Sequence, residues 1–136
     1  MRKHILFVCR YNRFRSLIAE ALFKKYNKDK SIKVKSASPI KGQPLSDNVK
    51  QLAKEFNLSI KEHPTGLTSR IMMWQDTTII VADNVPESLF DKNKEYGKEV
   101  IVWKIRDAET NSLDELRKIT KEIESKVINF VSSLKK

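Results

Sequence analysis

Residues 4–16 read H-I-L-F-V-C-R-Y-N-R-F-R-S and join a strand pattern to the start of a helix. The apolar run at residues 5–8 is unbroken, which is typical of a strand buried on both faces. The run ends at Cys9, the only cysteine of the chain, and a helical pattern opens at Ser16. A strand therefore leads through a short loop into a helix N-terminus, with a thiol where the strand ends.

This arrangement suits the binding of an anion. The first turn of a helix has unpaired N–H groups at the positive end of the helix dipole. Arg15 stands beside that turn, and its planar guanidinium can hold two phosphate oxygens. The same positive charges favour the thiolate of Cys9, which is the nucleophilic form. The interpretation is a cysteine-dependent phosphatase, and the plain alternative is a small buried thiol that only packs.

The composition is that of one ordinary globular domain, residues 1–136, with 40% hydrophobic and 32% charged residues. A single cysteine excludes an intramolecular disulfide and favours a reducing compartment, so we expect a cytoplasmic protein. No stretch is long enough to span a membrane, and residues 5–8 are too short an apolar run for a signal peptide.

The net charge of +10 attracts anionic partners. The lysines are spread along the whole chain and no motif that reads nucleic acid is present, so nucleic acid is not the expected partner. His4 and His63 are the only histidines and no Cys/His cluster exists, so we expect neither a metal nor another cofactor.

The rest of the chain alternates strand and helix patterns. Strands are expected at residues 32–35, 77–82 and 100–103, and helices at residues 16–26, 47–56, 68–74, 85–90 and 112–134. Such alternation favours a parallel sheet with right-handed crossovers and helices on both faces. The carboxyl ends of parallel strands share one edge, where ligands bind, so we expect Cys9, Asp83 and Asp107 to meet there.

Residues 5–23, I-L-F-V-C-R-Y-N-R-F-R-S-L-I-A-E-A-L-F, resemble the opening of the low-molecular-weight protein tyrosine phosphatase family. Thioredoxin-type arsenate reductases share the fold of that family, and weaker matches follow along nearly the whole chain. The resemblance implies a three-layer αβα fold with four parallel strands in the flavodoxin-like order 2-1-3-4. It also implies hydrolysis of phosphomonoesters, above all phosphotyrosine in proteins, with inorganic phosphate as product or inhibitor.

The resemblance implies three catalytic roles. Cys9 would form a thiophosphate intermediate, Arg15 would bind the phosphate, and Asp107 lies where the family carries its general acid and base. Ala108 stands where the family usually has a proline after this aspartate. Asp83 is expected either to orient Arg15 or a loop amide, or simply to cap its strand. The residues of the loop itself are expected to bind phosphate or support the site: Arg10, Tyr11, Asn12, Arg13 and Phe14.

Four polar residues are expected to brace the loop. In the family, the residues at the positions of Asn12, Ser16, Ser36 and His63 hydrogen-bond to one another. Asn12 tolerates a left-handed backbone better than most residues do. The hydroxyl of Ser16 is placed to donate to the thiolate or to the leaving sulfur.

The walls of the site depart from the family pattern. Many members have a glycine where Tyr11 stands, and residues 108–110, Ala-Glu-Thr, replace the aromatic segment that commonly follows the acid. Residues 39–44 lack an aromatic side chain too, so Tyr11 or Phe14 is the candidate stacking face. Phosphotyrosine is therefore expected from the resemblance rather than from the residues around the site.

Other functions stay open at this point. Arg10 and Arg13 would favour substrates with additional negative charge near the phosphate. A thioredoxin-coupled arsenate reductase needs two further cysteines, which this chain lacks. The alternatives are a single-cysteine arsenate reductase that uses an external thiol, and a non-catalytic module that binds phosphate or phosphopeptides.

Overall fold

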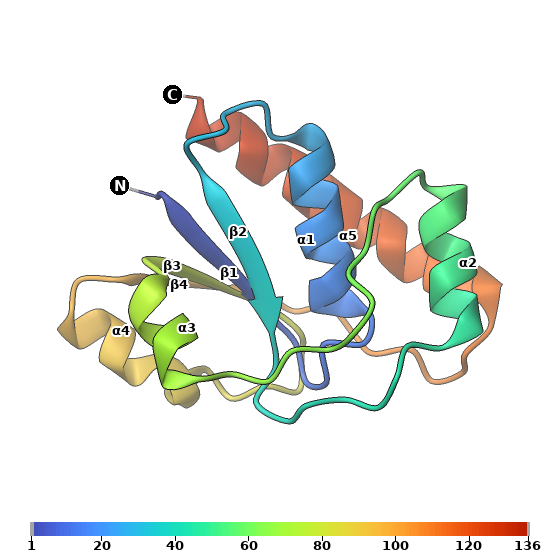
Figure 1. Cartoon of the computed structure of the whole chain (residues 1–136), viewed down its shortest axis with the longest axis horizontal. Coiled ribbons are helices and arrows are strands. Elements are labelled where there is room, and N and C mark those ends of the chain that lie inside the picture. Colours follow the sequence, from blue (N-terminus) through green and yellow to red (C-terminus); the bar gives the residue numbers. More distant parts are fainter. Residues whose placement is uncertain (1, 136) are drawn as a thin grey trace.

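The computed structural model describes residues 2–135 and confirms the predicted α/β fold. Its centre is a sheet of four strands, and every neighbouring pair is parallel. The strands are β1 (His4–Val8), β2 (Lys33–Ala37), β3 (Thr77–Val81) and β4 (Glu99–Trp103). They lie in the order β2-β1-β3-β4, which is the expected order 2-1-3-4 (Figure 1).

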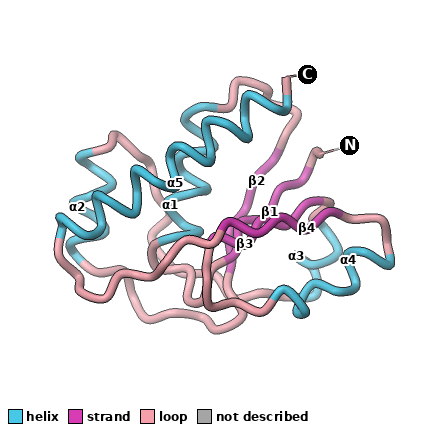
Figure 2. The backbone as a smooth tube through the Cα atoms, turned by 180° about the vertical axis from the view of Figure 1, so that it is seen from behind, coloured by secondary structure: helices cyan, strands magenta, loops and turns pink. Residues whose placement is uncertain are grey.

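Helices cover both faces of this sheet, as Figures 1 and 2 show from opposite sides. One face carries α1 (Arg15–Tyr26), α2 (Asp47–Glu55) and α5 (Leu113–Leu134). The other face carries α3 (Ser69–Trp74), the 3-10 turn η1 (Glu87–Phe90) and α4 (Asp91–Glu95). The molecule therefore has the three layers that the alternation of patterns predicts.

The alternation of side chains along β1 divides the core into two clusters. Ile5 and Phe7 pack with α1 and α5, whereas Leu6 and Val8 pack on the side of α3 and η1. All four side chains are buried. A central parallel strand must be apolar on both faces, which is why the run at residues 5–8 has no polar interruption.

The longest helix, α5, has 22 residues and begins after Ser112, whose hydroxyl accepts the backbone N–H of Glu115 at 3.3 Å. Its buried stripe faces the sheet and α1: Leu116, Ile119, Ile123, Val127 and Phe130. Among residues 2–135, neither this helix nor another is long and apolar enough to cross a membrane.

The region after β3 differs from the prediction of one helix at residues 85–90. The structure has the 3-10 turn there and then α4, which the sequence pattern does not predict. Helix α4 has no apolar stripe, and it is held by the buried amide of Asn93. That amide exchanges two hydrogen bonds with the amide of Gln75, at 2.9 and 3.1 Å. A polar anchor of this kind leaves no hydrophobic periodicity in the sequence.

Candidate active site

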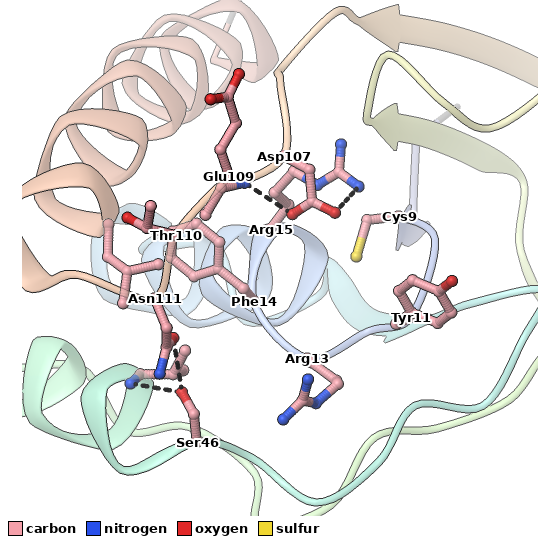
Figure 3. Close-up of a pocket in the computed structure, with 13 residues that line it drawn as sticks. Cys9, Tyr11, Arg13, Phe14, Arg15, Ser46, Asp107, Glu109, Thr110 and Asn111 are labelled. Carbon is pink, nitrogen blue, oxygen red and sulfur yellow. Dashed lines mark hydrogen bonds and ion pairs between the residues drawn. The ribbon is translucent and has the colours of Figure 1, made fainter.

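The loop between β1 and α1 places Cys9 at the carboxyl edge of the sheet. The thiol is buried beneath the opening and lines a cavity of about 460 Å³, with its sulfur directed toward that cavity (Figure 3). Its polar partner is Ser16, whose Oγ lies 3.0 Å from Sγ. Ser16 belongs to the first turn of α1. Strand end, loop and helix N-terminus therefore meet at the thiol, as the sequence predicts.

Arg15 is a buried side chain held by the loops that follow β3 and β4. Its guanidinium donates to the carbonyl oxygen of Ile105 and to Oδ1 of Asn84, each at 2.9 Å. The carboxylates of Asp83 and Asp107 lie 3.7 and 3.4 Å from its nitrogens. These partners compensate the burial of a charge, which is costly without them. Asn84 is a partner that was not predicted from the sequence, although it follows Asp83 directly.

Asp107 faces the same cavity from the loop after β4. One carboxylate oxygen pairs with Arg15, and the other accepts the N–H of Ala108 at 2.9 Å. Figure 3 shows the carboxylate between the guanidinium and the open space above Cys9. The arrangement brings a thiol and a cation from the loop after β1, and a carboxylate from the loop after β4, to one cavity.

Buried hydrogen bonds brace the loop around Asn12, which has a left-handed backbone (φ 54°). Its Nδ2 donates to Oγ of Ser16 at 2.7 Å and to Oγ of Ser36 at 3.0 Å. The backbone N–H of Thr65 donates to its Oδ1 at 2.9 Å. The expected hydrogen bonding among Asn12, Ser16 and Ser36 is thus confirmed.

The prediction that His63 joins this group is wrong. Its side chain is 82% exposed and lies 3.9 Å from the carboxylate of Glu62. The chain bends at Glu62 and His63, which turns the imidazole toward solvent. Lys61 lies at the network instead, because its Nζ donates to the carbonyl of Ser36 at 2.8 Å and to Oγ1 of Thr65 at 2.9 Å.

Burial lowers the pKa of Lys61 to about 8, and the negative charges of Glu20 and Cys9 oppose that effect. A lysine of this kind is hard to find by sequence analysis, because the chain is rich in solvated lysines. The only local signal in the sequence is that Lys61 stands just before Glu62-His63-Pro64, where the proline marks the end of an extended segment.

Arg13 ties the loop to its neighbour rather than presenting a free charge. Its Nε donates to the carbonyl of Gln43 at 3.0 Å and its Nη2 to that of Pro44 at 2.7 Å. Gly42 lies so close to the loop that a Cβ there would stand 2.4 Å from the carbonyl oxygen of Tyr11. The segment at residues 39–45 is therefore packed directly against the loop.

The rim of the cavity carries one exposed aromatic ring. Tyr11 is 36% exposed and lines the cavity, and the guanidinium of Arg10 lies 5.4 Å from its ring centroid. Phe14 also lines the cavity but is mostly buried in the core. The opposite wall is polar, where Oγ of Ser46 donates to Oδ1 of Asn111 at 3.2 Å (Figure 3).

Several solved structures resemble this one. An arsenate reductase from Archaeoglobus fulgidus is 27% identical, over 94% of this chain and 98% of its own, with a TM-score of 0.73. The YwlE arginine phosphatase from Geobacillus stearothermophilus is 20% identical, over 98% of this chain and 93% of its own, with a TM-score of 0.83. A low-molecular-weight protein tyrosine phosphatase from T. tengcongensis is 22% identical, over 96% and 99%, with a TM-score of 0.83. Because their named activities differ, the likeness does not identify a substrate.

No curated protein matches the sequence closely enough to count as a relative. The sequence pattern of one family, described as low molecular weight phosphotyrosine protein phosphatase, matches residues 4–136. This match includes the loop of Cys9 and Arg15 as well as Asp107, the groups that the fold gathers around the cavity. The chain therefore belongs to the low-molecular-weight phosphotyrosine protein phosphatase family.

Proposed function

We propose that the protein hydrolyses phosphate monoesters through a thiophosphate on Cys9, with phosphotyrosine in proteins as its substrate. The observation that carries the proposal is that Cys9, Arg15 and Asp107 all line the same cavity. These groups supply a nucleophile, a cation for the phosphoryl oxygens and a carboxyl group for proton transfer.

In the first step, the thiolate attacks phosphorus while the loop amides and Arg15 hold the phosphoryl oxygens. The S–P bond forms as the P–O bond to the leaving group breaks. The leaving oxygen takes the proton of the Asp107 carboxyl group, which becomes a carboxylate.

In the second step, the Asp107 carboxylate takes a proton from the attacking water, and the new P–O bond forms as the S–P bond breaks. The hydroxyl of Ser16, 3.0 Å from the sulfur, donates to the departing thiolate. Inorganic phosphate leaves as the product and competes for the same site. Cys9 has no second cysteine to protect it as a disulfide, so we place the protein in the reducing cytoplasm.

The rim supports phosphotyrosine through one group. Tyr11 offers a partly exposed ring beside the cavity, on which a substrate ring can stack. The polar wall at Ser46 and Asn111 gives no second aromatic face. Phosphoarginine is the competing substrate to compare, because a structural relative is named as an arginine phosphatase.

Arsenate reduction is the second candidate. It is favoured by the likeness to a named arsenate reductase at 27% identity, and an oxyanion cage for phosphate also fits arsenate. Cys9 is the sole cysteine, so this reaction needs a thiol from outside the protein to supply the electrons.

The test is hydrolysis of p-nitrophenyl phosphate across pH under reducing conditions, followed by phosphotyrosine and phosphoarginine peptides. We expect turnover by the wild type, none by Cys9→Ser or Arg15→Ala, and a loss of about 10²- to 10⁴-fold in Asp107→Asn. His63→Ala is the matched control and should keep full activity, since His63 lies outside the network. A wild type that binds phosphate or vanadate without turnover would contradict the proposal and favour a binding module. Arsenate reduction with glutathione or dithiothreitol, and no phosphatase activity, would favour the second candidate.

A further inference from the structure

We propose that Glu20 and Lys61 are positioning residues that lock the side-chain amide of Asn12 and thereby direct the Ser16 hydroxyl at Cys9. The proposal rests on the proposed role of Cys9 as nucleophile. Glu20 lies on α1 and Lys61 between α2 and α3, and neither lines the cavity. Both act from behind the loop, through hydrogen bonds whose donors and acceptors can be assigned one at a time.

The carboxylate of Glu20 fixes the direction of the first hydrogen bond. The Glu20 side chain is largely buried, and its Oε1 lies 2.5 Å from Oγ of Ser36. An ionised carboxylate only accepts hydrogen bonds, so the hydroxyl of Ser36 must donate its single proton to Glu20. Ser36 is then left as an acceptor toward Asn12, which lies 3.0 Å away.

The amide of Asn12 can therefore take only one orientation. Its nitrogen must face Ser36, and its oxygen faces the backbone N–H of Thr65, which donates at 2.9 Å. The second proton on the same nitrogen goes to Oγ of Ser16 at 2.7 Å. Both amide protons are thus used, and each points to a serine oxygen.

The consequence for the nucleophile follows at Ser16. Because its oxygen accepts from Asn12, its own proton is free to point at the sulfur of Cys9, 3.0 Å away. A donated hydrogen bond favours the thiolate. Without Glu20 to take the Ser36 proton, a reversed amide could accept from both serines, and Ser16 would then turn its lone pairs toward the sulfur.

Lys61 connects the two segments that contact the Asn12 amide, one at Ser36 and the other at Thr65. Its Nζ bonds to the carbonyl of Ser36 and to Oγ1 of Thr65, and it lies 3.9 Å from the carboxylate of Glu20. Burial lowers the pKa of Lys61 to about 8, the charges of Glu20 and Cys9 raise it, and that of Lys24 lowers it. Below about pH 8 the lysine therefore keeps its charge.

The test is the rate at which iodoacetamide alkylates Cys9 as a function of pH. This measurement needs no turnover, and Cys9 is the only cysteine that can react. Glu20→Leu removes the acceptor, and Lys61→Met removes the cation. We expect each to lower the rate at pH 6 by about tenfold, equivalent to a rise of about one pH unit in the midpoint. Glu20→Gln retains an acceptor oxygen and should stay within about threefold of wild type.

Lys24→Met is the matched control. Lys24 contacts the other oxygen of the same carboxylate at 3.2 Å, but its side chain is 59% exposed. An exposed pair of this kind contributes little, so the alkylation profile should be unchanged. A Lys24→Met loss as large as that of Lys61→Met would assign the effect to general charge and overturn the proposal.

Three further outcomes separate this proposal from the proposed function. Wild-type alkylation rates in folded Glu20→Leu and Lys61→Met overturn the proposal, whatever the turnover. If either variant does not fold, Ser36→Ala replaces it, because this change removes the hydroxyl that links Glu20 to Asn12. A tenfold lower alkylation rate in Ser36→Ala supports the proposal, and an unchanged rate overturns it. A wild type that is alkylated as expected but hydrolyses no phosphate monoester refutes the proposed function and leaves this network standing.

Discussion

The free energy of unfolding should depend on pH through Lys61. Burial lowers the pKa of this lysine from 10.5 to about 8 in the folded protein. The unfolded chain then binds more protons than the folded one between about pH 8 and 10.5, so the contribution of Lys61 to stability rises with pH across that window. Below about pH 8 both states are protonated, and the folded state carries the whole penalty of burying the charge.

The size of the effect follows from the two pKa values. The difference, 10.5 − 8, is about 2.5 pH units and amounts to about 3 kcal/mol at 1.36 kcal/mol per unit. Because the side chain keeps 27% of its exposure, we expect about 2 kcal/mol of this to be regained between pH 7 and pH 10. Lys61→Met has no such titration and should lack the gain.

The assay is urea unfolding of wild type and Lys61→Met at constant ionic strength and at one-unit steps from pH 7 to pH 10. The difference between the two proteins cancels the titrating groups on which Lys61 has no influence. Lys24→Met is again the control, and its difference from wild type should change far less with pH. Parallel curves for wild type and Lys61→Met would refute the reasoning, because they would mean that Lys61 has the same proton affinity in both states.

Three other perturbations test separate parts of the structure. Gly42→Ala places a Cβ 2.4 Å from the carbonyl oxygen of Tyr11. Urea unfolding should therefore show a loss of about 1–3 kcal/mol in the free energy of unfolding, and phosphate should inhibit the variant less strongly. Wild-type stability of the variant would contradict this close approach. Ser112→Ala removes the acceptor for the N–H of Glu115 at the start of α5 and should lower the free energy of unfolding by about 1 kcal/mol. No loss would mean that solvent caps the helix equally well. Inorganic phosphate at about 100 times its dissociation constant should raise the free energy of unfolding of the wild type by about 2.7 kcal/mol. Arg15→Ala should lose that gain, which a thermal shift assay measures. An equal gain in the variant would mean that phosphate binds elsewhere.

The fold was largely predictable because its signals are local. The unbroken apolar run at residues 5–8 requires a strand covered on both faces, and the structure covers it with two separate clusters. The strand order came only from the family resemblance, since periodicity does not say which strands pair. Helix α4 was missed because buried Asn93, and not an apolar stripe, holds it.

The candidate site was predictable where it is contiguous in sequence. Cys9, Arg15 and Ser16 lie on one loop and one helix turn, so their spacing alone indicates an anion site. Asn84 and Lys61 gain their roles from contacts with residues 69 and 25 positions away, which no local pattern records. The prediction for His63 is wrong because its side chain is exposed beyond the bend at Glu62 and His63, and Lys61 contacts the network instead.

The buried anchoring of Arg15 has a consequence for the newly made protein. Its two hydrogen-bond partners come 69 and 90 residues later in the chain, so the ribosome releases the thiol and its loop long before those partners exist. During that interval the guanidinium has nothing to hold it, and the thiol is open to oxidants. The proposed phosphate site is therefore complete only once the loop after β4 has reached the arginine. Phosphate binding in a translating chain would mark the moment at which the last strand joins the sheet.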